Sequence, residues 1–193
     1  MSGFNYDLSA EAALECTSYY SLNNRVSDCS GGYFVDPLNF ISKVGSVLRS
    51  TYPYAAYNYG SVPGYPSTPG ICSEQNRIYL GAGTVNLYAS GLTAIQIKTL
   101  LYTYGPVMIG LYANSQFLSY SGGVFTGCPA DSASYINHAI VLYGWDSSGN
   151  WLVRNQWGSS WGIGGNMILS SANDCGMSTL IGFVSVANKN SQV

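Results

Sequence analysis

The sequence predicts an α+β fold, with helices in the first part of the chain and strands in the second. Two stretches near the N-terminus carry apolar residues at helical spacing behind capping residues. From residue 107 onward, short β-branched and aromatic runs alternate with polar turns, which is typical of antiparallel strands. We therefore expect a helical lobe over residues 1–85 and a small antiparallel β-barrel lobe over residues 86–193.

Two helices are expected in the first lobe. Ser9 is a suitable N-cap for a helix that runs to about Tyr20. Asp36 is expected to cap a second helix, which has Pro37 at its first position and stops at Gly45. The Tyr-, Pro- and Gly-rich stretch 52–70 has no periodicity and is expected to be an ordered surface loop.

The second lobe begins with an expected strand at residues 85–92. Thr93 and Gln96 match a capping box, and a helix is expected from there to Gly105-Pro106. A bend is expected at Gly122-Gly123 and a loop over 128–135. The other expected strands are 107–112, the run that opens at residue 138, 151–155, 167–170 and 180–186.

The composition excludes several classes of partner. Charged residues make up 8% of the chain, against about 25% in an ordinary soluble domain. The net charge is −2 without any run of Lys or Arg, so neither nucleic acid nor an anionic membrane is expected as a partner. No apolar segment reaches the roughly 18 residues of a membrane span. With one histidine and no C-x-x-C pair, no zinc site is expected, and no other metal or cofactor.

The N-terminal residues 1–7 have neither the basic region nor the apolar region of a signal peptide. We therefore expect the chain to be a processed or separately made piece, or one whose start was lost.

The strongest functional signal is the single histidine, His138. It opens a strand pattern, and the strand that returns from the turn 146–150 ends at Asn155, so the two side chains are expected to lie close together. An amide beside an imidazole can accept a hydrogen bond from one ring nitrogen and leave the other for a nucleophile. Trp157 and Trp161 could shield such a pair from water. The alternative is a core or surface histidine without a chemical task.

The surrounding motifs resemble those of the papain-like, cathepsin-type cysteine peptidases. The similarity covers nearly the whole chain in family order. The matching segments are Asn137-His138-Ala139, Asn155-Gln156-Trp157-Gly158, the helix sequence Leu8 to Cys16, Cys29-Ser30-Gly31-Gly32, Tyr52-Pro53-Tyr54, Gly105-Pro106-Val107 and Asn173-Asp174-Cys175-Gly176. The resemblance implies the two-lobe papain-like fold, with a helical lobe that is incomplete here.

The resemblance also implies residue roles. His138 would be the catalytic base and acid, Asn155 would orient its ring, and Trp157 would shield their hydrogen bond. A substrate cleft would be lined by Gly31, Gly32, Tyr33, Ile136 and Ala139, with Leu180 at the floor of its specificity pocket. The alternative for the two glycines is a tight turn without a role in the cleft.

The family's nucleophilic cysteine lies upstream of the helix at residues 8–16, and its C-G-[SA]-C-[WY] segment occurs nowhere in this sequence. The chain is therefore expected to begin downstream of the nucleophile. Among its own five cysteines, Cys29 is the only candidate substitute, but its counterpart in the family is structural.

Five cysteines is an odd number. By resemblance, Cys16 pairs with Cys72 and Cys128 with Cys175, which leaves Cys29 unpaired, since its family partner lies in the missing segment. The alternative is that all five are reduced, buried thiols. Disulfides would place the protein in a lysosomal or vacuolar lumen, or outside the cell.

Two functions remain open at this stage. The chain could be the larger part of a cysteine endopeptidase that cleaves peptide substrates, its nucleophile being supplied by a second chain or segment. That partner would fill the helical lobe and could be disulfide-linked at Cys29. Alternatively, the chain is a non-catalytic pseudopeptidase that serves as a binding or structural module in a larger assembly.

Overall fold

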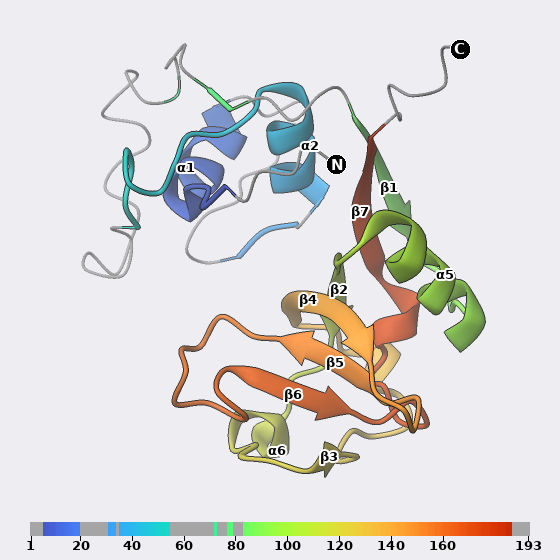
Figure 1. Ribbon diagram of the computed structural model, residues 1–193. Helices are drawn as coiled ribbons and strands as arrows, with labels where there is room; N and C mark the ends of the chain where they lie inside the picture. The colour runs from blue at the N-terminus through green and yellow to red at the C-terminus, as the bar shows by residue number, and fades with distance from the viewer. Residues whose placement is uncertain are drawn as a thin grey trace. The chain divides into compact units, whose positions relative to one another are not determined.

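Two units make up the chain in the computed structural model, which describes residues 6–19, 31–33, 35–54, 72, 77–78 and 83–186 (Figure 1). The first unit comprises Met1–Val85 and Val184–Val193, and the second comprises Asn86–Phe183. Cys29 and most of the expected loop at 52–70 lie outside the described residues.

The first unit contains helices α1 (Ala10–Tyr19) and α2 (Val35–Lys43). The predicted N-cap is confirmed, because Ser9 Oγ accepts a hydrogen bond of 2.9 Å from the backbone N–H of Ala12. The predicted start of α2 was wrong by two residues: Val35 precedes Asp36 and Pro37 inside the first turn. Proline is tolerated there because the first-turn N–H groups have no partner within the helix.

A small core holds the two helices together. Cys16, Phe40 and Cys72 are buried, and Ile41 and Val44 pack against them. Cys16 and Cys72 form a disulfide. This is the pairing that the family resemblance implies, and it closes a long loop of the chain.

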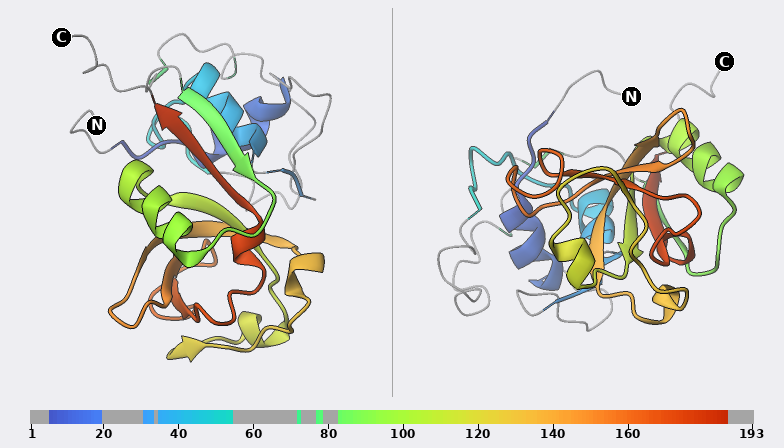
Figure 2. Two further views of the ribbon diagram at one scale, coloured as in Figure 1. Left: turned by 90° about the vertical axis from the view of Figure 1, so that its right-hand side faces the viewer. Right: turned by 90° about the horizontal axis from the view of Figure 1, so that it is seen from below.

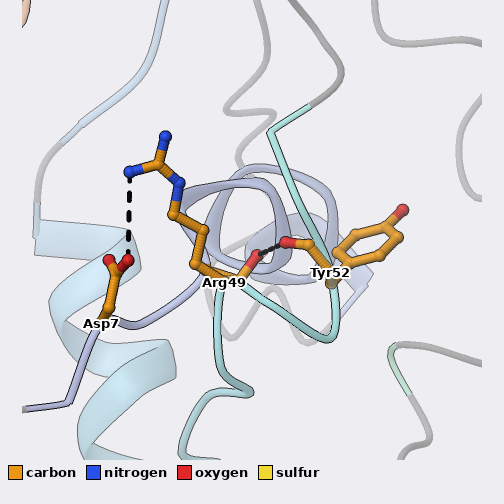
Figure 3. Close-up of polar contacts among 4 residues, drawn as sticks. Asp7, Arg49 and Tyr52 are labelled. Atoms are coloured by element: carbon orange, nitrogen blue, oxygen red, sulfur yellow. Dashed lines mark hydrogen bonds and ion pairs between the residues drawn. The ribbon is translucent and has the colours of Figure 1, made fainter.

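The segments on either side of α1 and α2 are tied together by backbone pairing. Leu8 bridges Leu48, and the backbone N–H of Arg49 donates to the carbonyl of Asp7 at 2.8 Å. The side chains of Asp7 and Arg49 lie 4.0 Å apart as an ion pair (Figure 3). Both are largely exposed, so this ion pair adds little to stability.

A mostly antiparallel seven-stranded sheet follows, in the order β1-β7-β2-β4-β5-β6-β3. β3 and β6 pair in parallel, whereas β2 with β4, β2 with β7, β4 with β5 and β5 with β6 pair antiparallel. The strands are β1 (Gly83–Tyr88), β2 (Val107–Leu111), β3 (Val124–Phe125), β4 (His138–Trp145), β5 (Trp151–Arg154), β6 (Asn166–Leu169) and β7 (Ile181–Val186). Helices with mostly antiparallel strands make this an α+β protein, as predicted.

Two helices accompany the sheet in the second unit, α5 (Ala94–Tyr104) and the short α6 (Ser115–Leu118). The capping box of Thr93 and Gln96 is present as predicted. Helix α5 buries Ile97 and Leu101 and packs against β2 and β4 (Figure 2). Single-turn helices lie at Ser132–Ser134 and Met177–Thr179. Neither these nor α6 were expected from the sequence.

The core of the second unit lies on one face of the central strands. Val107, Ile109 and Leu111 of β2 alternate inward, and the facing residues of β4 are Ile140 and Leu142. This period of two is the pattern of a half-buried strand. A disulfide joins Cys128 to Cys175, again the pairing that the resemblance implies.

The first unit also contains a carboxyl group with an altered pKa. Tyr52 Oη donates a hydrogen bond of 2.5 Å to Glu15 Oε2, and Glu11 nearby is 1% exposed. Burial raises the pKa of Glu15, and the hydrogen bond from Tyr52 partly opposes this effect. A raised folded-state pKa stabilises the fold below the unfolded-state value of about 4.3, and that contribution is lost as pH rises through the folded-state pKa.

We therefore expect the thermal stability of Glu15→Gln to fall less than that of the wild type as pH rises from acidic to neutral, because Gln cannot ionise. Thermal unfolding of both proteins across this range measures the difference. Asp7→Asn is the matched control, since Asp7 is an exposed carboxylate in the same unit. Equal pH dependence in Glu15→Gln and the wild type would contradict the assignment.

Candidate active site

The register of β4 and β5 brings His138 and Asn155 together. Val141 pairs with Arg154, so the next residue, Asn155, lies opposite Ile140 of the antiparallel strand. Residues opposite each other point their side chains to the same face of the sheet. His138 lies two residues further along that face and pairs with Leu111 of β2. The Nε2 atom of His138 lies 3.0 Å from Oδ1 of Asn155.

The contacts of Asn155 determine the tautomer of the histidine. Its Oδ1 also accepts the backbone N–H of Gln156 at 2.9 Å, so the atom that faces the ring is the oxygen and not the amide nitrogen. An oxygen acceptor requires Nε2 to carry the proton. In the neutral ring, Nδ1 then keeps its lone pair, as a general base requires.

Asn155 is held almost entirely out of water, at 4% exposure. Its backbone N–H donates to the carbonyl of Gly165 at 2.9 Å. Its Nδ2 atom is buried and has no hydrogen-bond partner. The side chain is therefore fixed by its oxygen and its backbone.

An aromatic cluster surrounds the pair. The ring of Trp157 stacks on His138 with 4.6 Å between centroids and 27° between planes. Phe117 is fully buried and forms T-shaped contacts with His138, at 6.0 Å between centroids, and with Trp157, at 5.8 Å. Trp161 contacts Trp157 edge to face at 5.4 Å and does not itself stack on the histidine.

Phe117 is the site residue that the sequence reasoning missed. It lies in α6, whose N-cap Asn114 accepts the backbone N–H of Phe117 through its side chain at 2.9 Å. An Asn three residues before an aromatic residue is a capping signal that predicts a helical turn there. It does not predict that the ring reaches the histidine.

The cluster alters the acidity of the imidazole. Burial lowers the pKa of His138 below its ordinary value, because the charged form loses hydration, and the hydrogen bond to Asn155 partly opposes this. The neutral form, with a free Nδ1, is therefore favoured near neutral pH.

The predicted specificity residues of the second unit gather around Gly110. A Cβ at this glycine would lie 2.6 Å from Cδ2 of Leu180 and 3.0 Å from Cγ2 of Ile136. Ala139 pairs with Gly110 and directly follows His138. Gly31, Gly32 and Tyr33 are exposed residues of the first unit, whereas the histidine cluster is built by the second unit alone. Their place in a cleft stays a prediction.

Four cysteines of the described residues are bonded in the two disulfides, and none of these four can act as a thiol nucleophile. Within the same residues, no group of three His, Cys, Asp or Glu side chains is placed to hold a metal ion. The helices in this part of the chain do not include one that could span a lipid bilayer.

A buried Asn155 that contacts the single histidine, with a tryptophan stacked on the same ring, agrees with the family match: the model of the papain family cysteine proteases covers residues 1–184. The chain belongs to this papain family. Fruit bromelain of Ananas comosus is 31% identical over 191 residues, which cover 91% of the chain and 47% of that protein. Cathepsin O of Homo sapiens is 30% identical over 189 residues, 93% of the chain and 52% of that protein.

Solved structures of papain-family proteins share the fold. The bromelain protease from Ananas comosus in complex with the E64 inhibitor has a TM-score of 0.72 and 25% identity, over 96% of this chain and 81% of that one. A structure from a study of the mite allergens Blo t 1 and Der p 1 has a TM-score of 0.81 and 23% identity, over 96% and 58%. The chain spans about half the length of fruit bromelain and cathepsin O.

We expect Trp157→Ala to raise the pKa of His138 towards its ordinary value, because loss of the stacked ring lets water reach the imidazole. NMR titration measures this directly, since the chain contains one histidine. Trp145→Ala is the matched control: Trp145 lies on β4 and is 38% exposed, close to the 36% of Trp157. An unchanged pKa in Trp157→Ala would show that the indole does not shield the ring.

Proposed function

We propose that this chain is the larger part of a papain-family cysteine endopeptidase, with a nucleophilic thiol supplied by a segment that its 193 residues do not contain. The observation that carries the proposal is the 3.0 Å contact between His138 Nε2 and Asn155 Oδ1 beneath the stacked ring of Trp157. This contact leaves Nδ1 available to a thiol. A histidine with only a structural role does not need a dedicated orienting amide.

The chemistry follows from this geometry. Nδ1 of His138 takes the proton of the incoming thiol, and the thiolate attacks the peptide carbonyl carbon. The imidazolium then gives the proton to the leaving amine, and water hydrolyses the thioester with His138 again acting as base. Asn155 Oδ1 holds the ring in place through both steps, and it hydrogen-bonds the N–H at Nε2 whether the ring is neutral or charged.

The same proposal assigns the remaining roles. Ile136, Ala139 and Leu180 would contact substrate side chains near His138, and Gly31, Gly32 and Tyr33 would line the cleft from the first unit. The missing segment would fill the helical lobe, with a disulfide to Cys29. The two disulfides favour an oxidising location, either a lysosomal or vacuolar lumen or the extracellular space.

A second candidate is a pseudopeptidase that acts as a binding or structural module. The observation that favours it is the cysteine inventory: four of five cysteines are in disulfides, and the C-G-[SA]-C-[WY] segment does not occur. In this case the histidine cluster would serve packing alone.

The first experiment is the intact mass of the protein purified from its source, with and without reductant. We expect reduction to release a cysteine-containing peptide linked to Cys29. The same material should hydrolyse a fluorogenic peptide and lose this activity after treatment with iodoacetamide, whereas the isolated 193-residue chain should be inactive. A mass for the chain alone, without activity, would favour the pseudopeptidase.

In the complete enzyme, which is the chain together with its nucleophile segment, we expect His138→Ala to reduce kcat/KM by about 100- to 10,000-fold, the usual contribution of a general acid and base. Tyr143→Phe is the control, because Tyr143 is an exposed residue of the same strand. Activity that survives in His138→Ala would show that another group performs the proton transfer.

A further inference from the structure

The segment that carries the two site tryptophans is held by its own backbone. We call residues 157–165 the tryptophan loop. The backbone N–H of Gly165 donates to the carbonyl of Trp161 at 2.7 Å, and that of Trp161 to the carbonyl of Gly158 at 3.4 Å. Gly158, Gly162, Gly164 and Gly165 all have positive φ, a region that L residues rarely adopt. The loop is thus a tight, glycine-dependent turn.

Arg154 of β5 lies against the end of this loop. Its Nη1 donates to the carbonyl of Gly164 at 2.8 Å. A Cβ at Gly165 would lie 3.1 Å from both Cζ and Nη1 of Arg154, so the guanidinium packs closely on the bare glycine backbone. The next residue, Asn155, donates its backbone N–H to the carbonyl of Gly165. Residues 154 and 155 therefore hold the loop at two neighbouring carbonyls.

The position of Trp157 depends on this attachment. Trp157 lies outside the strands of the sheet, and its side chain is 36% exposed. Trp161 is anchored separately, because its Nε1 donates to the carbonyl of Leu118 at 3.1 Å. The ring of Trp157 contacts those of His138, Phe117 and Trp161, and among the described residues it has no hydrogen bond to fix it as Trp161 has. The course of the loop backbone then decides whether its indole covers the histidine.

We propose that Arg154 is a positioning residue, whose guanidinium fixes the tryptophan loop so that Trp157 remains stacked on His138. This inference rests on the proposed role of His138 as the base of the site. A planar, delocalised cation suits the task, because it can donate to a carbonyl while lying flat against a glycine. An ammonium at this place could donate to Gly164 but could not cover Gly165 in the same way.

The test uses Arg154→Met, which keeps an unbranched side chain and loses all donors, and Arg154→Lys, which keeps the charge. The readouts are the NMR titration of the single imidazole and the ring-current shift of its protons. In Arg154→Met we expect the pKa of His138 to move upward as water replaces the indole, and the ring-current shift to shrink. Arg154→Lys should fall between Arg154→Met and the wild type.

Arg49→Met is the matched control, since it removes a guanidinium that pairs with Asp7 in the first unit. It should leave both histidine signals unchanged. If Arg154→Met unfolds more easily but both signals stay at their wild-type values, Arg154 only stabilises the fold and the proposal is wrong. If Arg154→Met does not fold, the test rests on Arg154→Lys. A pKa and a ring-current shift of His138 that both stay at their wild-type values in this variant would also overturn the proposal.

These signals are measured on the chain without any substrate or nucleophile. A failure of the Arg154 proposal is therefore distinguishable from a failure of the peptidase proposal. The latter would appear as a lack of peptide hydrolysis by the protein purified from its source.

Discussion

The hydrogen bond between His138 and Asn155 is the interaction on which the arrangement of the site depends, and it requires one register of β4 with β5. Val141 must pair with Arg154, so that Asn155 follows on the face of β4 that carries His138. Because side chains alternate, a shift of one residue in this pairing would turn one partner to the opposite face. Both strands also bury alternate side chains in the core, which resists such a shift, so hydrophobic packing sets the geometry of a polar pair.

The same burial carries a cost. Nδ2 of Asn155 is buried without a hydrogen-bond partner, and an unsatisfied buried donor typically costs about 1–3 kcal/mol. An apolar residue at this position would avoid the penalty. A module selected for stability alone has no physical reason to retain the amide, whereas a base that must be oriented does. This argument favours the peptidase over the pseudopeptidase.

Local patterns predicted much of the fold, because caps and strand periods act over a few residues. The helix starts at Ser9 and Thr93 and the facing of His138 and Asn155 belong to this group. What the sequence did not reveal depends on distant residues. Phe117 reaches His138 from 21 positions away, through an unexpected helical turn. The early start of α2 was missed for a local reason. Proline is tolerated at the first helical position and elsewhere in the first turn, because the N–H groups there have no partner within the helix, so the sequence does not distinguish the two positions.

The electrostatic state of His138 also bears on how a nucleophile would join the site. The pKa of the ring is lowered because burial removes hydration while Asn155 supplies a dipole and not a charge. A thiolate beside Nδ1 would reverse this balance, since an opposite charge favours the imidazolium and a nearby cation favours the thiolate. The two groups would then titrate as a pair. Docking of the nucleophile segment and activation of its thiol would thus be one event, and the neutral, shielded imidazole of this chain is the form that is ready for it.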